Sequence, residues 1–107
     1  MLDKDAVIDW ALRRQEAFRN LDRYLKMIKD IATRMDPEAE VFLFGSVAEG
    51  TYTYSSDIDV LIVTRIDPAE VLRTLWEAGI REPFEIHVQT PERAEEYRRK
   101  AKLIKIL

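Results

Sequence analysis

The sequence predicts an α/β (α+β) domain built around a small mixed β-sheet. Apolar side chains recur every three or four residues from about residue 4 to residue 35, a spacing typical of a helix. Short apolar runs follow at 41–44, 58–64 and 84–89, and the second is rich in β-branched residues, as strands are. Helix start signals precede and follow the third run. The expected order is therefore helix, strand, strand, helix, strand, helix, in two or three layers.

The first segment carries apolar residues at positions 7, 11, 18, 21, 25, 28, 32 and 35, and only Arg14 interrupts the spacing. This predicts one long helix, or two in tandem with a break near residues 14–16. About thirty helical residues extend about 45 Å, whereas a domain of this size is only about 25–30 Å across. We therefore expect the N-terminal half to overhang. The segment ends at Asp36, because a residue before proline is pushed out of the α region.

Capping signals mark the starts of the two later helices. The sequence DPAE at 67–70 combines an Asp cap, a proline at the first helical position and a Glu at the third. This helix is expected to run to Gly79, since glycine commonly ends helices. The sequence TPE at 90–92 opens the last helix by the same logic. Apolar and polar residues alternate between them at 84–89, which predicts a strand with one polar face.

Composition bounds the function. The 107 residues predict a single domain, 1–107, and the net charge of −3 gives no basic field for duplex nucleic acid, so nucleic acid is not an expected partner. The basic residues at 13–14 and 98–102 form either a local basic strip or, as we favour, solvated helix faces. The absence of cysteine excludes disulfides and thiolate metal sites. We find no signal peptide and no run of about 20 apolar residues, so we expect a cytoplasmic chain without a membrane partner.

A Gly-Ser pair, Gly45 and Ser46, follows the first predicted strand. Glycine allows a tight turn that exposes successive backbone N–H groups, and its lack of a side chain lets an anion approach closely. A short helix beginning at Ser46 would add the partial positive charge of its N-terminus. The pair is a candidate phosphate-binding turn, and the alternative is an ordinary strand-to-helix turn capped by Ser46.

Two aspartates, Asp57 and Asp59, stand at the start of the second predicted strand. Residues i and i+2 of a strand point to one face, about 6.6 Å apart, so the two carboxylates are expected to project together. Like charges at this spacing repel and raise each other's pKa unless a cation lies between them. A hard divalent ion such as Mg²⁺ prefers carboxylate oxygens. The pair is a candidate metal site, and the alternative is two solvated aspartates, with Ser56 or Asp57 capping a turn.

The Gly-Ser turn and the Asp-x-Asp pair stand at a fixed spacing in GSVAEGTYTYSSDIDVLIV, residues 45–63. This stretch resembles the signature of the polymerase-β-like nucleotidyltransferase superfamily, and the short chain is similar to its minimal nucleotidyltransferases, the MNT group. The resemblance implies a mixed β-sheet with helices packed on one face and Mg²⁺ held by three carboxylates. It also implies transfer of a nucleoside monophosphate, here AMP from ATP, with release of pyrophosphate.

Carried over to this sequence, the resemblance implies that Gly45 and Ser46 bind the β- and γ-phosphates of the nucleotide. Ser56 is a further candidate for nucleotide binding. Asp57 and Asp59 become the first two metal ligands. They bridge two Mg²⁺ ions, one on the triphosphate and one lowering the pKa of the attacking hydroxyl. The implied mechanism needs no covalent enzyme intermediate.

The third carboxylate has to come from a neighbouring strand, and the alternation at 84–89 offers Glu85. If the apolar residues of that strand pack on the helices, Glu85 points toward the aspartates, where it would hold the second ion and assist deprotonation. Relatives more often carry Asp there, and the alternative is an exposed acidic residue on an edge strand. His87, the only histidine, shares the face of Glu85 and is either a base or ligand or a half-buried side chain.

Glu49 is a second departure, because relatives commonly carry Arg at this place. A triphosphate brings roughly four negative charges, so the missing cation leaves more charge for the metal ions to neutralise. The sequence therefore leaves open whether the site turns over with Glu49.

The acceptor follows only from the resemblance. MNT proteins resemble antitoxins that act beside a HEPN-domain ribonuclease, and the implied reaction transfers AMP to a tyrosine of that toxin. We therefore expect a HEPN-domain protein and a nucleoside triphosphate as partners, with a homo-oligomer left open. The overhanging helix and the apolar tail at 103–107 are candidate docking surfaces, although the tail is as well suited to completing the core. The alternatives are a binding module that neutralises the HEPN partner by covering it, and nucleotidyl transfer to RNA or a small molecule.

Overall fold

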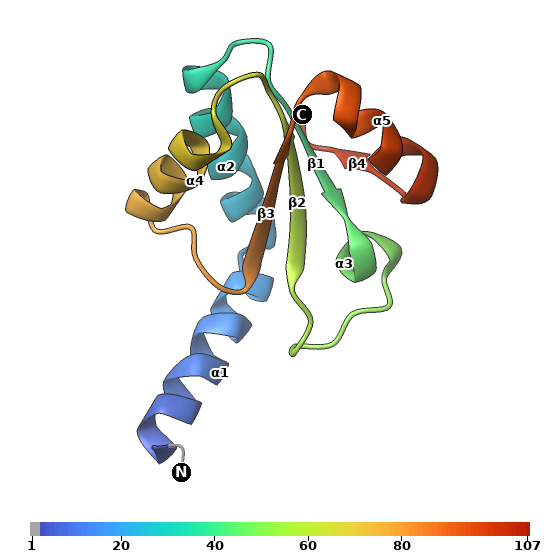
Figure 1. Cartoon of the computed structure of the whole chain (residues 1–107). Helices are drawn as coiled ribbons and strands as arrows, with labels where there is room; N and C mark the ends of the chain where they lie inside the picture. The colour runs from blue at the N-terminus through green and yellow to red at the C-terminus, as the bar shows by residue number, and fades with distance from the viewer. Residues whose placement is uncertain (1–2) are drawn as a thin grey trace.

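A computed structural model describes residues 3–107, and its elements follow the predicted order (Figure 1). The helices α1 (Lys4–Arg19) and α2 (Leu21–Met35) precede strand β1 (Glu40–Phe44) and the short helix α3 (Gly45–Glu49). Strand β2 (Ile58–Val63) is followed by α4 (Pro68–Glu77), β3 (Phe84–Gln89), α5 (Pro91–Lys100) and the two-residue strand β4 (Ile104–Lys105). The predicted class and its small mixed sheet are confirmed.

The strands form one sheet in the order β3-β2-β1-β4. β1 pairs antiparallel with β2 and with β4, whereas β2 pairs parallel with β3. A parallel pair needs a crossover connection, and α4 provides it. Strand β2 lies inside the sheet and is completely buried at Ile58, Val60, Leu61 and Ile62. The sheet is therefore organised around the strand that begins at the aspartate pair.

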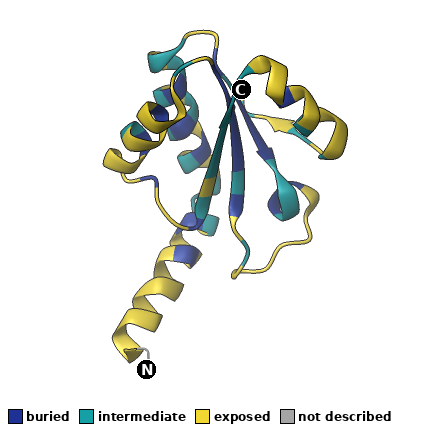
Figure 2. Ribbon diagram, in the orientation of Figure 1, coloured by how far each residue is buried: buried dark blue, intermediate teal, exposed yellow. Residues whose placement is uncertain are grey.

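Helices cover both faces of the sheet, which gives three layers (Figures 1 and 2). On one face, Ile28 of α2 and Leu75 of α4 belong to the same core as Val60 of β2. On the other face, Leu61 packs in a second cluster with Ala94 of α5. The expectation of helices on one face holds for α2 and α4 and is wrong for α5. The physical reason is that β2 is a continuous apolar run, so both of its faces need cover.

The first helical segment breaks at Asn20 and not at residues 14–16. Asn20 has φ −111° and ψ 30°, outside the helical region, and it separates α1 from α2. Its side-chain amide donates to the main-chain carbonyl of Glu16 at 3.0 Å. Short polar side chains compete in this way with the helical hydrogen bonds. The break therefore comes from a local side-chain hydrogen bond that the apolar spacing does not record.

Arg14 interrupts the apolar spacing because it is buried while charged, with only 3% of its surface exposed. The expectation of a solvated basic face is therefore wrong for Arg14. It holds for Arg13 and for the exposed basic residues at 98–100. A buried guanidinium needs hydrogen-bonding partners, and those of Arg14 lie at the functional site described below.

The N-terminal half of α1 extends away from the rest of the chain, as predicted (Figures 1 and 2). The longest principal extent of the molecule is 44 Å, against 29 and 25 Å for the other two. Val7, Ile8, Trp10 and Leu12 are each 43–58% exposed. This projecting helix thus presents apolar surface to solvent. Within residues 3–107, no helix has the length and apolar character needed to cross a membrane.

The C-terminal tail completes the sheet. Residues of β4 pair with Phe42 and Leu43 of β1, and the N–H of Ile106 donates to the carbonyl of Val41 at 2.8 Å. Leu103 packs against the cluster on the α5 face. Of the two uses considered for this tail, the structure shows the one in which it extends the sheet and its packing.

Candidate metal and nucleotide site

The turn from β1 into α3 brings the main chain against an acidic side chain. Gly45 has φ +75°, a conformation that residues with side chains rarely adopt. A Cβ at this position would also clash with the Oδ2 atom of Asp59. Two independent features therefore require glycine at position 45: the positive φ and the Asp59 carboxylate that occupies the place of a Cβ.

Strand pairing places the carboxylates side by side. Asp59 lies opposite Phe44 of β1 on one side and opposite Glu85 of β3 on the other. Asp57 directly precedes β2, in the loop that follows α3. Both Asp57 and Asp59 are close enough to Glu85 to raise its pKa. The three carboxylates that the sequence assigned to the site are thus brought together at one end of the sheet.

Burial and neighbouring negative charges raise the pKa values of two carboxyl groups in this cluster. The pKa of Asp59 is raised, mainly by burial and further by the charge of Asp57, while His87 opposes the shift. The pKa of Glu85 is raised mainly by Asp57, then by burial and by Asp59. A cation placed between such carboxylates stabilises their ionised forms and lowers their pKa values. Perturbed carboxylates that converge in this way are typical of functional sites.

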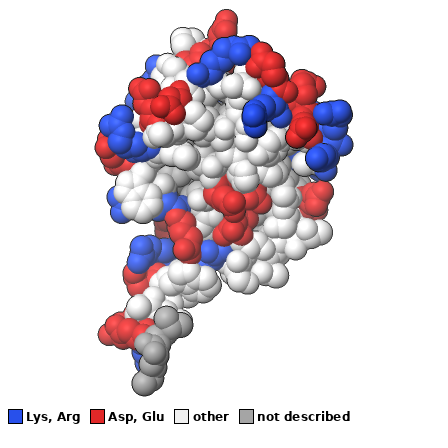
Figure 3. Space-filling view, in the orientation of Figure 1, with Lys and Arg blue, Asp and Glu red and all other residues white. Residues whose placement is uncertain are grey.

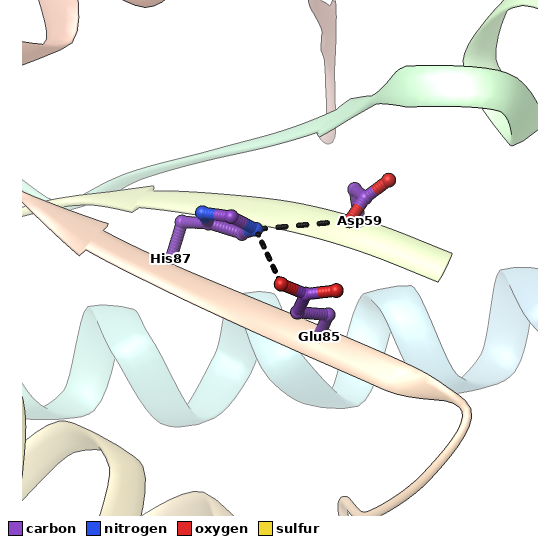
Figure 4. A group of neighbouring side chains, drawn as sticks. All are labelled: Asp59, Glu85 and His87. Atoms are coloured by element: carbon purple, nitrogen blue, oxygen red, sulfur yellow. Dashed lines mark ion pairs between the residues drawn. The ribbon is translucent and has the colours of Figure 1, made fainter. Parts of the chain in front are cut away.

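His87 faces the same carboxylates (Figure 4). Its Nε2 atom lies 3.6 Å from Oδ1 of Asp59 and 3.5 Å from Oε1 of Glu85. Among the described residues this nitrogen is buried and has no hydrogen-bond partner. The ring meets Phe44 edge to face, with 5.0 Å between the ring centres. His87 is thus half-buried and faces the carboxylates, and its role as a base or ligand stays a prediction.

A chain of polar side chains supports the other nitrogen of His87. Its Nδ1 atom lies 3.3 Å from the hydroxyl of Tyr97, and the amide of Gln89 donates to that hydroxyl at 3.4 Å. Sequence reasoning missed both residues. Gln89 continues the two-residue alternation of Glu85 and His87, so the strand pattern contained a signal for it. Tyr97 comes from α5 and carries no such signal.

The donor set fits a divalent cation. One ligand atom each from Asp59, Glu85 and His87 lie within 4.8 Å of one another. Carboxylate oxygens and an imidazole nitrogen are ordinary ligands of such ions in proteins. A cation bound among these donors would give the Nε2 atom a partner and would offset the causes that raise the two pKa values. Figure 3 shows acidic atoms over this end of the sheet, surrounded by mostly uncharged surface.

The remaining predicted residues lie around this cluster. Ser46 is in the first turn of α3 and half-buried, and its carbonyl accepts from the N–H of Thr51 at 3.0 Å. The Ser56 hydroxyl accepts from the N–H of Thr53 at 3.0 Å, which closes the turn before Asp57. Ser56 thus has the turn-capping contact that was its alternative role, and its contact with a nucleotide stays a prediction. Glu49 is exposed at the end of α3.

Arg14 ties α1 to the segments that carry the carboxylates, and sequence reasoning missed this role. Its guanidinium donates to the carbonyls of Tyr54, at 2.6 Å, and of Ser56. It also donates to Oε1 of Glu82 at 3.0 Å, just before β3. One buried side chain therefore holds the loop that ends at Asp57 and the turn that leads to Glu85.

Comparison with known proteins identifies the fold. The family model described as "Nucleotidyltransferase domain" matches residues 25–107. A crystal structure called a "putative nucleotidyltransferase" is 32% identical, with a TM-score of 0.65 over 77% of this chain and 96% of that one. A second structure so called, from Sulfolobus solfataricus, is 23% identical, with a TM-score of 0.59 over 88% of this chain and 85% of that one, and it supports the fold alone.

No curated protein matches the chain. The family match covers the acidic cluster and the whole sheet, from α2 to β4, and leaves out α1. The resemblance seen in residues 45–63 is therefore confirmed at the level of the family. This chain belongs to the nucleotidyltransferase domain family.

Proposed function

We propose that this protein is a divalent-metal-dependent nucleotidyltransferase that transfers AMP from ATP to a hydroxyl of a protein acceptor. The observation that carries the proposal is the meeting of Asp57, Asp59 and Glu85 beside the Gly45 turn. Family membership supports nucleotidyl transfer as the reaction. The choice of ATP, Mg²⁺ and a protein acceptor goes beyond what family membership supports.

The reaction forms a bond between an acceptor oxygen and the α-phosphorus of ATP and breaks the bond to pyrophosphate, which leaves. Two bound Mg²⁺ ions supply neutralisation of the triphosphate charge and a lower pKa for the acceptor hydroxyl. Asp57 and Asp59 would hold both ions, and Glu85 would hold the second. Glu85 would also receive the proton of the acceptor hydroxyl. Gly45 leaves room for the carboxylate of Asp59, and the backbone N–H groups of its turn would bind the triphosphate beside that carboxylate.

The acceptor in this proposal is a HEPN-domain ribonuclease, neutralised by AMP on a tyrosine. Its support is the resemblance of residues 45–63 to the MNT group and the exposed apolar positions of α1. Exposed apolar surface of this kind is common where proteins dock. In this arrangement α1 holds the partner while the end of the sheet presents the nucleotide.

A second candidate function is a binding module that neutralises the same partner by covering it. The observation that favours it is Glu49, an exposed anion at the end of α3, where the resemblance to the MNT group implies a cation. An anion at this place weakens the attraction for a triphosphate. The two functions predict the same complex and different chemistry.

Intact-mass spectrometry of a HEPN partner, incubated with the protein, ATP and Mg²⁺, separates the two functions. Transfer adds the mass of one or more AMP units to the partner, and the variant Asp57→Asn/Asp59→Asn abolishes the addition. The matched control Asp30→Asn/Glu96→Gln changes the charge equally at sites on α2 and α5, away from the carboxylate cluster, and keeps the activity. An unchanged partner mass, with toxicity still suppressed by Asp57→Asn/Asp59→Asn, would establish the binding module.

A further inference from the structure

The imidazole of His87 is held in a fixed orientation that the reaction proposed above does not explain. Its Nδ1 atom meets the hydroxyl of Tyr97 at 3.3 Å, and Gln89 holds that hydroxyl from the other side at 3.4 Å. Phe44 and Tyr97 both meet the ring edge to face, with 5.0 and 6.0 Å between ring centres. A histidine whose second nitrogen is held by a polar partner is the usual arrangement for a metal-binding imidazole.

The Nε2 atom of the ring lies within ion-pair distance of two carboxylate oxygens but makes no hydrogen bond to either (Figure 4). The separations of 3.5 Å to Glu85 and 3.6 Å to Asp59 exceed the usual range for a charge-assisted hydrogen bond. When Nδ1 carries the ring proton and donates it to Tyr97, the lone pair of Nε2 faces two anions, which is unfavourable without a cation between them. Ligands about 2.1 Å from one metal ion lie about 3 to 3.4 Å from each other, close to these separations.

We propose that Nε2 of His87 is a nitrogen ligand of the metal site, and that the site therefore binds first-row transition cations such as Mn²⁺ and Co²⁺ in preference to Mg²⁺. Imidazole suits transition ions, whereas Mg²⁺ favours oxygen ligands alone. The inference rests on the proposed metal-dependent function and refines the choice of ion. Tyr97 and Gln89 are positioning residues in this arrangement, since they act through the ring.

Direct metal binding tests this inference without nucleotide or acceptor. Pulsed electron paramagnetic resonance of the Mn²⁺-loaded, tag-free protein should show coupling to one imidazole nitrogen. Because the sequence holds a single histidine, that coupling can come only from His87. The variant His87→Gln, which keeps a polar side chain of similar reach, should lose the coupling. Calorimetric titration of the same variant should show the ratio of Mn²⁺ to Mg²⁺ affinity falling about 100-fold.

The variant Tyr97→Phe separates positioning from folding. It keeps the aromatic ring that packs on Phe44 and removes only the hydroxyl, so the thermal transition should hardly change. The Mn²⁺ affinity should nevertheless fall about tenfold, because the ring of His87 loses its orienting partner. Circular dichroism checks the fold of both variants.

Three results would overturn the inference: no Mn²⁺ binding by the unaltered protein, bound Mn²⁺ without nitrogen coupling, or an unchanged affinity ratio in His87→Gln. Each would leave His87 as a cationic partner of Asp59 and Glu85. Failure of AMP transfer is a separate outcome. A protein that shows the nitrogen coupling but transfers nothing would refute the proposed function and leave the ligand assignment in place.

Discussion

The end of the sheet that carries the carboxylates and the projecting helix α1 are built in opposite ways. At the sheet, strand pairing and the close approach of Gly45 fix the position of Asp59 on both sides. The helix, in contrast, exposes Trp10 and Leu12 over its N-terminal half. Its C-terminal half is tied to the loop before Asp57, through buried Arg14 and through Phe18, whose ring stacks on Tyr52. The family match includes the first region and not the second. The acidic end of the sheet thus lies in the part of the chain that matches the family, and the docking role of α1 stays a proposal.

The largest expected effect comes from removing a carboxylate at the sheet. Asp59→Asn should reduce AMP transfer about 10³-fold, because it removes a charged ligand at the centre of the site. Thermal stability should not fall, since the pKa of Asp59 is raised by burial and its ionised form is costly in the folded protein. Rate measurements and calorimetry check the two results. Asp30→Asn on α2 is the control, and a loss of activity in both variants would mean that the effect is not local.

The next effect concerns the junction between the two regions. Arg14→Gln should lower the free energy of unfolding by about 2–3 kcal/mol, because it leaves the carbonyls of Tyr54 and Ser56 without their donor. The ion pair with Glu82 adds little to this figure, since that carboxylate side chain is 59% exposed. Urea denaturation measures the loss. The neighbouring change Arg13→Gln, at an exposed position, should cost less than about 0.5 kcal/mol. Equal losses in the two variants would refute the role given to Arg14.

Two glycines with almost the same φ allow the cost of backbone strain to be measured separately from the cost of a steric clash with Asp59. Gly45 and Gly50 have φ of +75° and +76°, but only a Cβ at Gly45 meets Asp59, and a Cβ at Gly50 meets nothing within 4 Å. Gly50→Ala should cost about 1 kcal/mol of backbone strain, and Gly45→Ala about 1 kcal/mol more, together with weaker Mn²⁺ binding. Denaturation and calorimetry of the pair provide the test. If both variants bind Mn²⁺ equally well, the turn does not shape the site.

The smallest effect is a dependence on pH in the metal-free protein. The folded-state pKa values of Asp59 and Glu85 are raised, so these groups favour the folded state when protonated and lose that contribution as pH rises through the raised values. With a chelator present, the stability of Asp59→Asn/Glu85→Gln relative to the unaltered protein should therefore increase as pH rises from about 4 through the raised pKa values. Denaturation at several pH values measures the difference. A difference that does not change with pH would mean that the pKa values of these carboxylates are not raised in the folded protein.

The sequence could predict which candidate residues share a face of the sheet, because strands impose a period of two. From the sequence alone, that period puts Glu85 and His87 on one face of their strand and Asp57 beside Asp59. The tight turn at Gly45 was also predicted from the sequence, and the structure shows it with φ +75°, but the close approach of Asp59 is seen only in the structure. These residues act through neighbours in the chain or directly across paired strands.

The features that escaped prediction depend on distant partners. The acceptors of Arg14 lie 40, 42 and 68 residues away along the chain, so its burial leaves no periodic signal nearby. Tyr97 reaches His87 only because α5 packs on the face of the sheet opposite to α2 and α4. The break at Asn20 is local, but it depends on one side-chain hydrogen bond and not on the spacing of apolar residues.

The most direct test of the account is a crystal structure with Mn²⁺ and a non-hydrolysable ATP analogue. Anomalous scattering should place an ion within coordination distance of Asp59 and Glu85, with the triphosphate against the Gly45–Ser46 turn. The same map should show Nε2 of His87 bound to the metal. Nucleotide bound elsewhere on the molecule, or an ion that contacts none of these carboxylates, would contradict the assignment of this end of the sheet as the site of nucleotidyl transfer.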